Sequence, residues 1–97
     1  MRVITHRAIV EFSAKHPNAA SALDAWYRTI KAGTFHNLAE LKATFPSVDL
    51  IKDTISVFNI GGNKYRLIVV VKYQHRMIYI RHIFTHAEYH KAKWKEE

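Results

Sequence analysis

The 97-residue sequence predicts an α+β fold, in which a small twisted antiparallel sheet packs against an N-terminal helical hairpin. Apolar residues recur with the helical period in the first half of the chain, and strand-forming runs replace this pattern from Ile55 onward. The chain has no cysteine, and 48% of its residues are hydrophobic. A chain of this composition can bury one core without disulfides, so we expect one domain over residues 1–97.

A short strand and a helical hairpin are expected at the start of the chain. Residues 1–4 form the strand, and Thr5 is a candidate N-cap for a helix that runs to His16. Pro17 ends this helix, and apolar residues at i, i+3, i+4 and i+7 then predict a second helix that ends at Gly33. The link between the two helices is short, so they should lie antiparallel to each other.

Two further helices are predicted from capping boxes, in which two side chains three residues apart satisfy the free N–H groups of a helix start. Asn37 and Glu40 have this spacing before a brief third helix. Thr85 and Glu88 have it before a last helix over residues 86–95.

Three strands are predicted in the second half of the chain, where Val, Ile, Tyr and Phe are concentrated. The strands are residues 55–60, 64–73 and 77–84. Tight turns at residues 61–63 and 74–76 join them into an antiparallel meander. Residues 47–54, which precede the meander, are interpreted as a loop.

The charge distribution points to a polyanionic partner. The net charge is +7, and residues 61–97 carry +5 of it, which suits nucleic acid. A solvated basic surface that only maintains solubility is the alternative. The longest apolar run, residues 67–71, is too short for a membrane helix, and the first residues do not form a signal peptide. We therefore expect a cytoplasmic protein that does not contact membranes.

Two arginines in the predicted strands are candidate anion ligands. The alternation of side chains places Arg66 on one face with Ile68, and Arg81 on one face with Tyr79 and Ile83. Desolvating a guanidinium among apolar neighbours is costly unless an anion or a polar group meets it. Arginine stems that lie over an open sheet face are the alternative explanation. The opposite face of the middle strand is expected to meet the helices through Tyr65, Leu67, Val69, Val71 and Tyr73.

The junction between the last strand and the last helix adds titratable groups. With Thr85 as N-cap, His86 is the first helical residue, where free N–H groups and the helix dipole favour the neutral imidazole. Tyr89 follows about one turn later, on the same short helix as His90 and Lys91. A neutral imidazole can act as a base, and a helix start attracts phosphate. The alternative is that the capping box only starts a helix and that His86 is an exposed residue with no role in function.

Metal binding is a competing interpretation. His82, His86 and His90 recur every four residues, which resembles the spacing of metal ligands. His82 should lie on a strand while the other two lie on a helix, and no HExxH motif or cysteine accompanies them. We therefore expect no metal and no cofactor. Gly61 and Gly62 lack the spacing of a phosphate-binding loop and are expected to form a hairpin turn.

Three segments together resemble the HigB toxins of the RelE-like superfamily. They are residues 57–68 (VFNIGGNKYRLI), residues 79–81 (YIR) and residues 85–89 (THAEY), and the likeness extends over nearly the whole chain. The resemblance implies one RelE-like toxin domain over residues 1–97, the toxin half of a type II toxin–antitoxin pair. It also implies an endoribonuclease that cuts mRNA on translating ribosomes and forms a hetero-oligomer with a HigA-type helix-turn-helix antitoxin.

The resemblance also suggests roles for individual residues. Arg66 matches the arginine of a Tyr-Arg-Leu strand that relatives use to stabilise the scissile phosphate, and Arg81 is a candidate second phosphate contact. His86 and Tyr89 fall where relatives place acid and base groups. RelE proper has two lysines in the strand before the turn, whereas this chain has none there, which leaves the general base open. Residues expected to bind RNA are Asn59, Lys64, Lys72, Lys91, Lys93 and Lys95.

Two alternatives to the nuclease stay open at this point. One is a non-catalytic RNA- or DNA-binding module that uses the same basic face, and the other is a protein whose basic surface only docks an acidic partner. The nuclease hypothesis makes a geometric demand that the alternatives do not. Arg66, Arg81, His86 and Tyr89 should converge on one exposed hollow.

Overall fold

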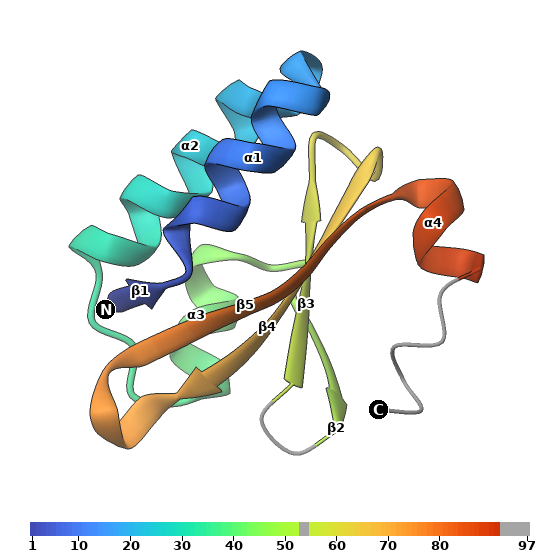
Figure 1. Cartoon of the computed structure of the whole chain (residues 1–97). Coiled ribbons are helices and arrows are strands. Elements are labelled where there is room, and N and C mark those ends of the chain that lie inside the picture. The colour runs from blue at the N-terminus through green and yellow to red at the C-terminus, as the bar shows by residue number, and fades with distance from the viewer. Residues whose placement is uncertain (53–54, 92–97) are drawn as a thin grey trace.

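A computed structural model of the chain describes residues 1–52 and 55–91 (Figure 1). One short strand and three helices come first, and consecutive strands and a last helix follow. In chain order the elements are β1 (Arg2–Ile4), α1 (His6–Lys15), α2 (Pro17–Ala32), α3 (Leu38–Thr44), β2 (Asp49–Lys52), β3 (Ile55–Ile60), β4 (Tyr65–Lys72), the 3-10 turn η1 (Tyr73–His75), β5 (Met77–Thr85) and α4 (His86–Lys91).

The strands form one five-stranded sheet in the order β1-β5-β4-β3-β2. β3, β4 and β5 make the predicted antiparallel meander, and the short β1 pairs with β5 in parallel. The interpretation of residues 47–54 as a loop is wrong for Asp49–Lys52, which pairs with β3 as the strand β2, and residues 53–54 lie outside the described residues. This strand lies at the sheet edge and has mostly exposed side chains, so its short, charged sequence does not alternate as a half-buried strand does.

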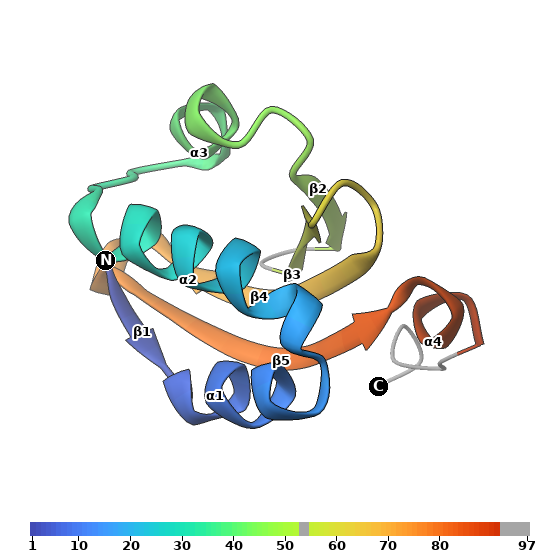
Figure 2. The same ribbon diagram turned by 90° about the horizontal axis from the view of Figure 1, so that it is seen from above.

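The main hydrophobic core lies between one face of the sheet and the helices α1, α2 and α3 (Figure 2). α1 and α2 lie side by side along this face as the predicted hairpin. The side chains of β4 predicted to face the helices do so, since Tyr65, Leu67, Val69 and Val71 all belong to this core, with Tyr73 packed against it. The predicted side-chain alternation of β4 is therefore confirmed.

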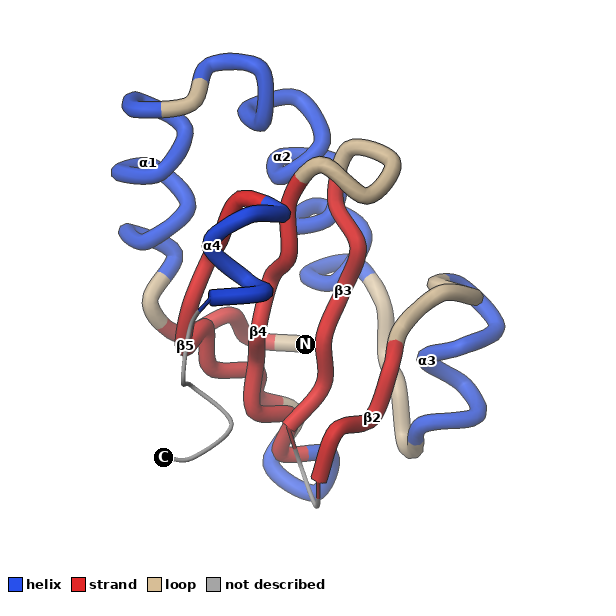
Figure 3. The backbone as a smooth tube through the Cα atoms, turned by 90° about the vertical axis from the view of Figure 1, so that its right-hand side faces the viewer, coloured by secondary structure: helices blue, strands red, loops and turns tan. Residues whose placement is uncertain are grey.

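The opposite face of the sheet has a smaller cluster of buried residues, which are Ile55, Val57 and Ile68. α4 lies on this side of the sheet, across from α1 and α2 (Figures 1 and 3). Phe84 of β5 and Tyr89 of α4 pack against the cluster. This packing holds the last helix of the described chain against the strands that carry Arg66 and Arg81.

Two predicted helix ends are correct in position and different in mechanism. α1 begins after Thr5, but the Thr5 side chain does not cap it, because Thr5 Oγ1 exchanges hydrogen bonds of 3.1 Å with the backbone of Ile80 instead. The side chain thus continues the pairing of β1 with β5. Gly33 ends α2 in extended backbone, with φ −90° and ψ 160°. A Cβ atom at Gly33 would lie 2.6 Å from the Phe35 ring, so the close approach of Phe35 requires glycine.

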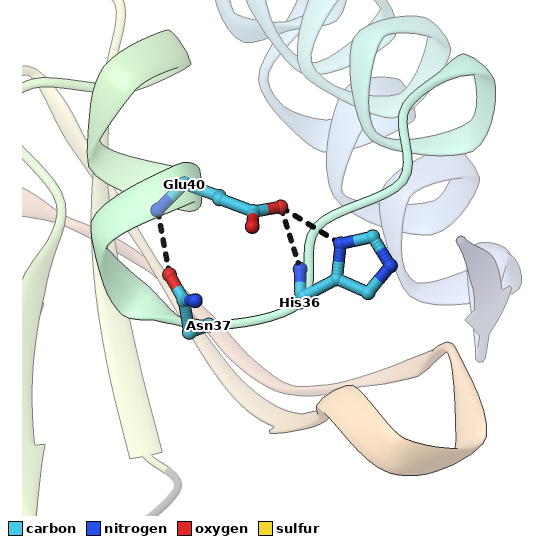
Figure 4. Close-up of polar contacts among 3 residues, drawn as sticks. All are labelled: His36, Asn37 and Glu40. Carbon is cyan, nitrogen blue, oxygen red and sulfur yellow. Dashed lines mark hydrogen bonds and ion pairs between the residues drawn. The ribbon is translucent and has the colours of Figure 1, made fainter.

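The start of α3 shows the predicted capping box in a shifted form (Figure 4). The backbone N–H of Glu40 donates to Asn37 Oδ1 at 2.9 Å. Glu40 Oε1 accepts from the backbone N–H of His36 at 3.0 Å and contacts His36 Nδ1 at 2.9 Å. These hydrogen bonds favour the carboxylate and lower the pKa of Glu40.

Candidate active site

Arg66 lies on the α4 side of the sheet, in the middle of three neighbouring strands. It pairs with Asn59 of β3 on one side and with Phe84 of β5 on the other. Arg66 Nη1 donates to the backbone carbonyls of Asn63 at 3.0 Å and Tyr65 at 3.3 Å. These two carbonyls thus hold Nη1 of the guanidinium. The other terminal nitrogen, Nη2, is directed toward His86 of α4.

The start of α4 is a complete capping box, as predicted. The backbone N–H of Thr85 donates to Glu88 Oε1 at 2.8 Å, and the backbone N–H of Glu88 donates to Thr85 Oγ1 at 3.2 Å. A further bond, from the backbone N–H of His86 to the carbonyl of Lys64 at 2.9 Å, ties the helix start to the beginning of β4. These three bonds determine where the side chains of α4 lie relative to Arg66.

Three of the four side chains predicted to converge do so. Arg66 Nη2 lies 3.4 Å from His86 Nδ1, and the Arg66 guanidinium carbon lies 5.5 Å from the centre of the Tyr89 ring. His86 is exposed, while Arg66 and Tyr89 are partly exposed. The group therefore presents a cation, an imidazole and a phenol ring to solvent at one end of the sheet.

His90 extends this group, although it is not among the site residues predicted from the sequence. Its Nε2 lies 3.1 Å from His86 Nε2, and the two rings are 4.5 Å apart. A guanidinium can only donate, so His86 Nδ1 accepts from Arg66 and the neutral ring has its proton on Nε2. His86 then donates to His90. The sequence signal for His90 is its spacing of four residues from His86, which also resembles the spacing of metal ligands.

Arg81 lies apart from this group, at a bulge in β5 and beside α1. Val69 pairs with Ile80 while Ile68 pairs with His82, so Arg81 has no counterpart in the register between the two strands. Tyr79 pairs with Val70 on the α4 side of the sheet, whereas Ile83 pairs with Leu67 on the helix side, so the prediction that Tyr79, Arg81 and Ile83 all share one face is wrong for Tyr79. Arg81 instead lines a shallow hollow beside α1, with Ala8, Glu11, Phe12, Lys15, His82 and Ile83.

The expected RNA-binding residues are spread around the Arg66 group. Asn59 is the cross-strand neighbour of Arg66, and Lys72 shares its face at the far end of β4. Lys64 and Lys91 are exposed beside the start and at the end of α4. Lys93 and Lys95 lie outside the described residues, as does the expected extension of the last helix beyond residue 91.

The three histidines with the spacing of metal ligands, His82, His86 and His90, lie in two separate places. The His82 ring stacks on Phe84, with 5.0 Å between ring centres and an angle of 14°. His86 and His90 pair with each other on α4. Over residues 1–52 and 55–91, no group of three or more His, Asp or Glu residues is placed to hold a metal ion. No helix in the same ranges is long and apolar enough to cross a membrane.

Comparison with known proteins identifies the family of the chain. Residues 19–92 match the HigB toxin family, described as the RelE-like toxic component of a toxin-antitoxin system. The "mRNA interferase toxin HigB" of Escherichia coli K12 is 38% identical over 104 residues, covering 99% of this chain and 100% of the relative. The "mRNA interferase HigB" of Shigella flexneri matches to the same extent, and one from Escherichia coli O6:H1 is 34% identical over 94% of this chain and 90% of the relative.

The class is therefore that of RelE-like toxins, and the α+β fold with its mixed five-stranded sheet is compatible with it. The chain belongs to the HigB toxin family. The resemblance noted from the sequence segments is confirmed. Membership in a toxin–antitoxin family implies that an antitoxin is its partner.

Proposed function

We propose that this chain is a toxin that cleaves mRNA on translating ribosomes in the cytoplasm, as one RelE-like domain over residues 1–97. Its relatives bear the name mRNA interferase, which supports an endoribonuclease. The contact of Arg66 Nη2 with His86 Nδ1, beside the Tyr89 ring, is the main observation that supports this group as the site of cleavage.

The chemistry proposed for this site is transesterification by the neighbouring 2′-hydroxyl of RNA. A base removes the 2′-hydroxyl proton, and the oxygen attacks the adjacent phosphorus. An acid protonates the 5′-oxygen that leaves, so the products are a 2′,3′-cyclic phosphate and a free 5′-hydroxyl. The negative charge on the phosphorus group grows in the transition state, and a fixed guanidinium stabilises it.

Arg66 has the properties of the charge-stabilising group. The carbonyls of Asn63 and Tyr65 hold its Nη1, so the guanidinium is oriented before any RNA arrives. A phosphate that takes up the donor of Nη2 would release His86 Nδ1, which then has a free lone pair beside the reacting atoms. We assign the proton transfers to His86 and Tyr89 and leave open which of them acts as the base.

The remaining basic residues are proposed to hold the RNA backbone. Asn59, Lys64, Lys72, Lys91, Lys93 and Lys95 make up this set. Arg81, which lies at the bulge in β5, is proposed to contact phosphate next to the α1 hollow and at a distance from the scissile group. Because each phosphate contact releases counterions, binding should weaken as the salt concentration rises.

The antitoxin is proposed to be of the HigA type, with a helix-turn-helix fold, and to form a hetero-oligomer with this chain. An antitoxin surface with acidic side chains would cover the basic residues around Arg66 and exclude RNA. The opposite charges would also strengthen the complex.

The test is incubation of the purified protein with mRNA and translating ribosomes. The expected products have 2′,3′-cyclic phosphate ends, and a 2′-deoxy nucleotide at the scissile position should abolish cleavage. Cleavage of the deoxy substrate would contradict the mechanism. RNA binding without cleavage would favour the non-catalytic module. Overexpression that does not arrest growth would favour a protein that only docks an acidic partner.

A further inference from the structure

The imidazoles of His86 and His90 have a separation that suits a shared ion. Both are exposed, they lie four residues apart on α4, and their Nε2 atoms are 3.1 Å apart. We propose that the two histidines form an exchangeable site for a transition-metal ion of the zinc type, and that an ion bound there inhibits the nuclease. The inhibitory effect depends on the function proposed above, whereas the binding site does not.

The geometry needs little change to accept an ion. Zinc binds histidine nitrogens at about 2.0–2.1 Å, so two of them in a tetrahedral site lie about 3.3–3.4 Å apart. The observed separation is within a few tenths of an ångström of this value. Small rotations of two exposed rings are enough to admit the ion. Neutral imidazole is also the ligand that Zn²⁺, Ni²⁺ and Cu²⁺ prefer over carboxylates.

Two protein ligands make the site exchangeable. A third His, Asp or Glu does not join the pair within residues 1–52 and 55–91. Water would therefore fill the other positions around the ion, and a chelator should remove the ion readily. Such a site differs from a structural zinc centre, which has four protein ligands and contributes to folding.

The ion competes with the hydrogen bond between Arg66 and His86. A metal on His86 Nε2 forces the ring proton onto Nδ1, the atom that accepts from Arg66 Nη2 at 3.4 Å. Two donors would then face each other, and the positive guanidinium would also repel the ion. Metal binding and the proposed active arrangement are thus mutually exclusive. It follows that removing Arg66 should strengthen metal binding.

Isothermal titration calorimetry of the full chain with zinc chloride tests the site. The expected result is one ion per chain. His90→Gln should weaken binding by more than the roughly 10- to 100-fold that loss of an outer-shell partner costs. Arg66→Ala should bind several-fold more tightly. His75→Gln, which changes an exposed histidine outside α4, should bind as the unchanged chain does. Equal zinc affinity of His90→Gln and the unchanged chain would overturn the proposal.

Cleavage measurements separate the site from the function. Zinc should reduce cleavage over the concentrations that saturate the site, and EDTA should restore it. His90→Gln, compared with its own rate without zinc on the same ribosomes, should be insensitive to these concentrations. Equal inhibition of both proteins would overturn the inhibitory role. A chain that does not cleave mRNA without zinc would refute the proposed function, while calorimetry would still decide whether the site exists.

Discussion

The two faces of β4 differ in content although their residues alternate along one strand. Leu67, Val69 and Val71 are almost completely buried against the helices. On the other face, Ile68 belongs to a cluster with few buried residues, and Arg66 follows it toward the start of the strand, at the edge of the exposed group on α4. One strand therefore supplies both the centre of the core and the arginine of the candidate active site.

The alternation of side chains along β4 therefore separates the residues that stabilise the fold from the residue proposed to act in catalysis. The helix-facing face stabilises the domain by burial, and the α4 face can hold polar and charged groups because it needs to bury less. Substitutions at neighbouring positions of β4 should consequently affect different properties. Those on the helix-facing face should lower stability, and those on the α4 face should lower cleavage. The following predictions test that separation.

The largest effect is expected at His86. His86→Gln keeps a hydrogen-bonding side chain but cannot transfer protons, so cleavage should fall by about a hundred- to ten-thousand-fold. The free energy of unfolding should change little, because His86 is exposed. Single-turnover cleavage on translating ribosomes and urea unfolding measure the two quantities. His75→Gln is the matched control, and equal cleavage by the two variants would contradict the role of His86.

On the other face, Leu67→Ala should destabilise the domain by about 2–5 kcal/mol, because Leu67 is fully buried and the substitution leaves a cavity. Lys72→Ala on the same strand should change the unfolding free energy by about 0.5 kcal/mol or less, since Lys72 is exposed. Urea unfolding measures both. If the two variants lose the same stability, the contrast between the faces is wrong.

A smaller effect is expected at Thr85, where β5 ends and α4 begins. Thr85→Ala removes the side-chain acceptor for the Glu88 N–H and should cost about 0.5–2 kcal/mol in the stability of α4. Cleavage should fall with it, because the position of His86 depends on this cap. Thr85→Ser should retain both properties. Hydrogen exchange at the Glu88 amide reports the cap, and identical exchange in the Ala and Ser variants would argue against it.

The smallest effect is a pH dependence at α3, away from the site. The hydrogen bonds from His36 lower the pKa of Glu40 below its ordinary value of 4.5. A lowered carboxyl pKa stabilises the fold above about pH 4.5, and this contribution disappears as the pH falls through the lowered pKa. The stability difference between the unchanged chain and Glu40→Gln should therefore shrink on acidification. A difference that stays constant from pH 6 to pH 3 would refute this linkage.

Local patterns in the sequence were sufficient for much of the fold. The capping box of Thr85 and Glu88, the helical hairpin and the meander all depend on neighbours close in the chain, and the structure confirms them. The alternation of β4 also follows from its sequence, because this strand pairs with β3 without interruption from Tyr65 to Val70.

The errors have a common physical cause, which is contact between distant segments. The bulge at Arg81, which separates the face of Tyr79 from that of Ile83, arises in the pairing of β5 with β4, and period-two counting cannot detect it. β2 exists as a strand through its hydrogen bonds to β3, since its own residues have weak strand character. The pairing of His90 with His86 was visible in their spacing, but its meaning depends on Arg66, twenty residues earlier in the chain.

The most direct test of the account is cleavage by Arg66→Ala, measured together with its unfolding free energy. The account predicts a loss of about a hundredfold or more in the cleavage rate constant, with stability within about 1 kcal/mol of the unchanged chain. Arg7→Ala, which removes an exposed arginine on α1, should leave both values unchanged. A folded Arg66→Ala variant that cleaves mRNA at the unchanged rate would contradict the assignment of the active site to this face.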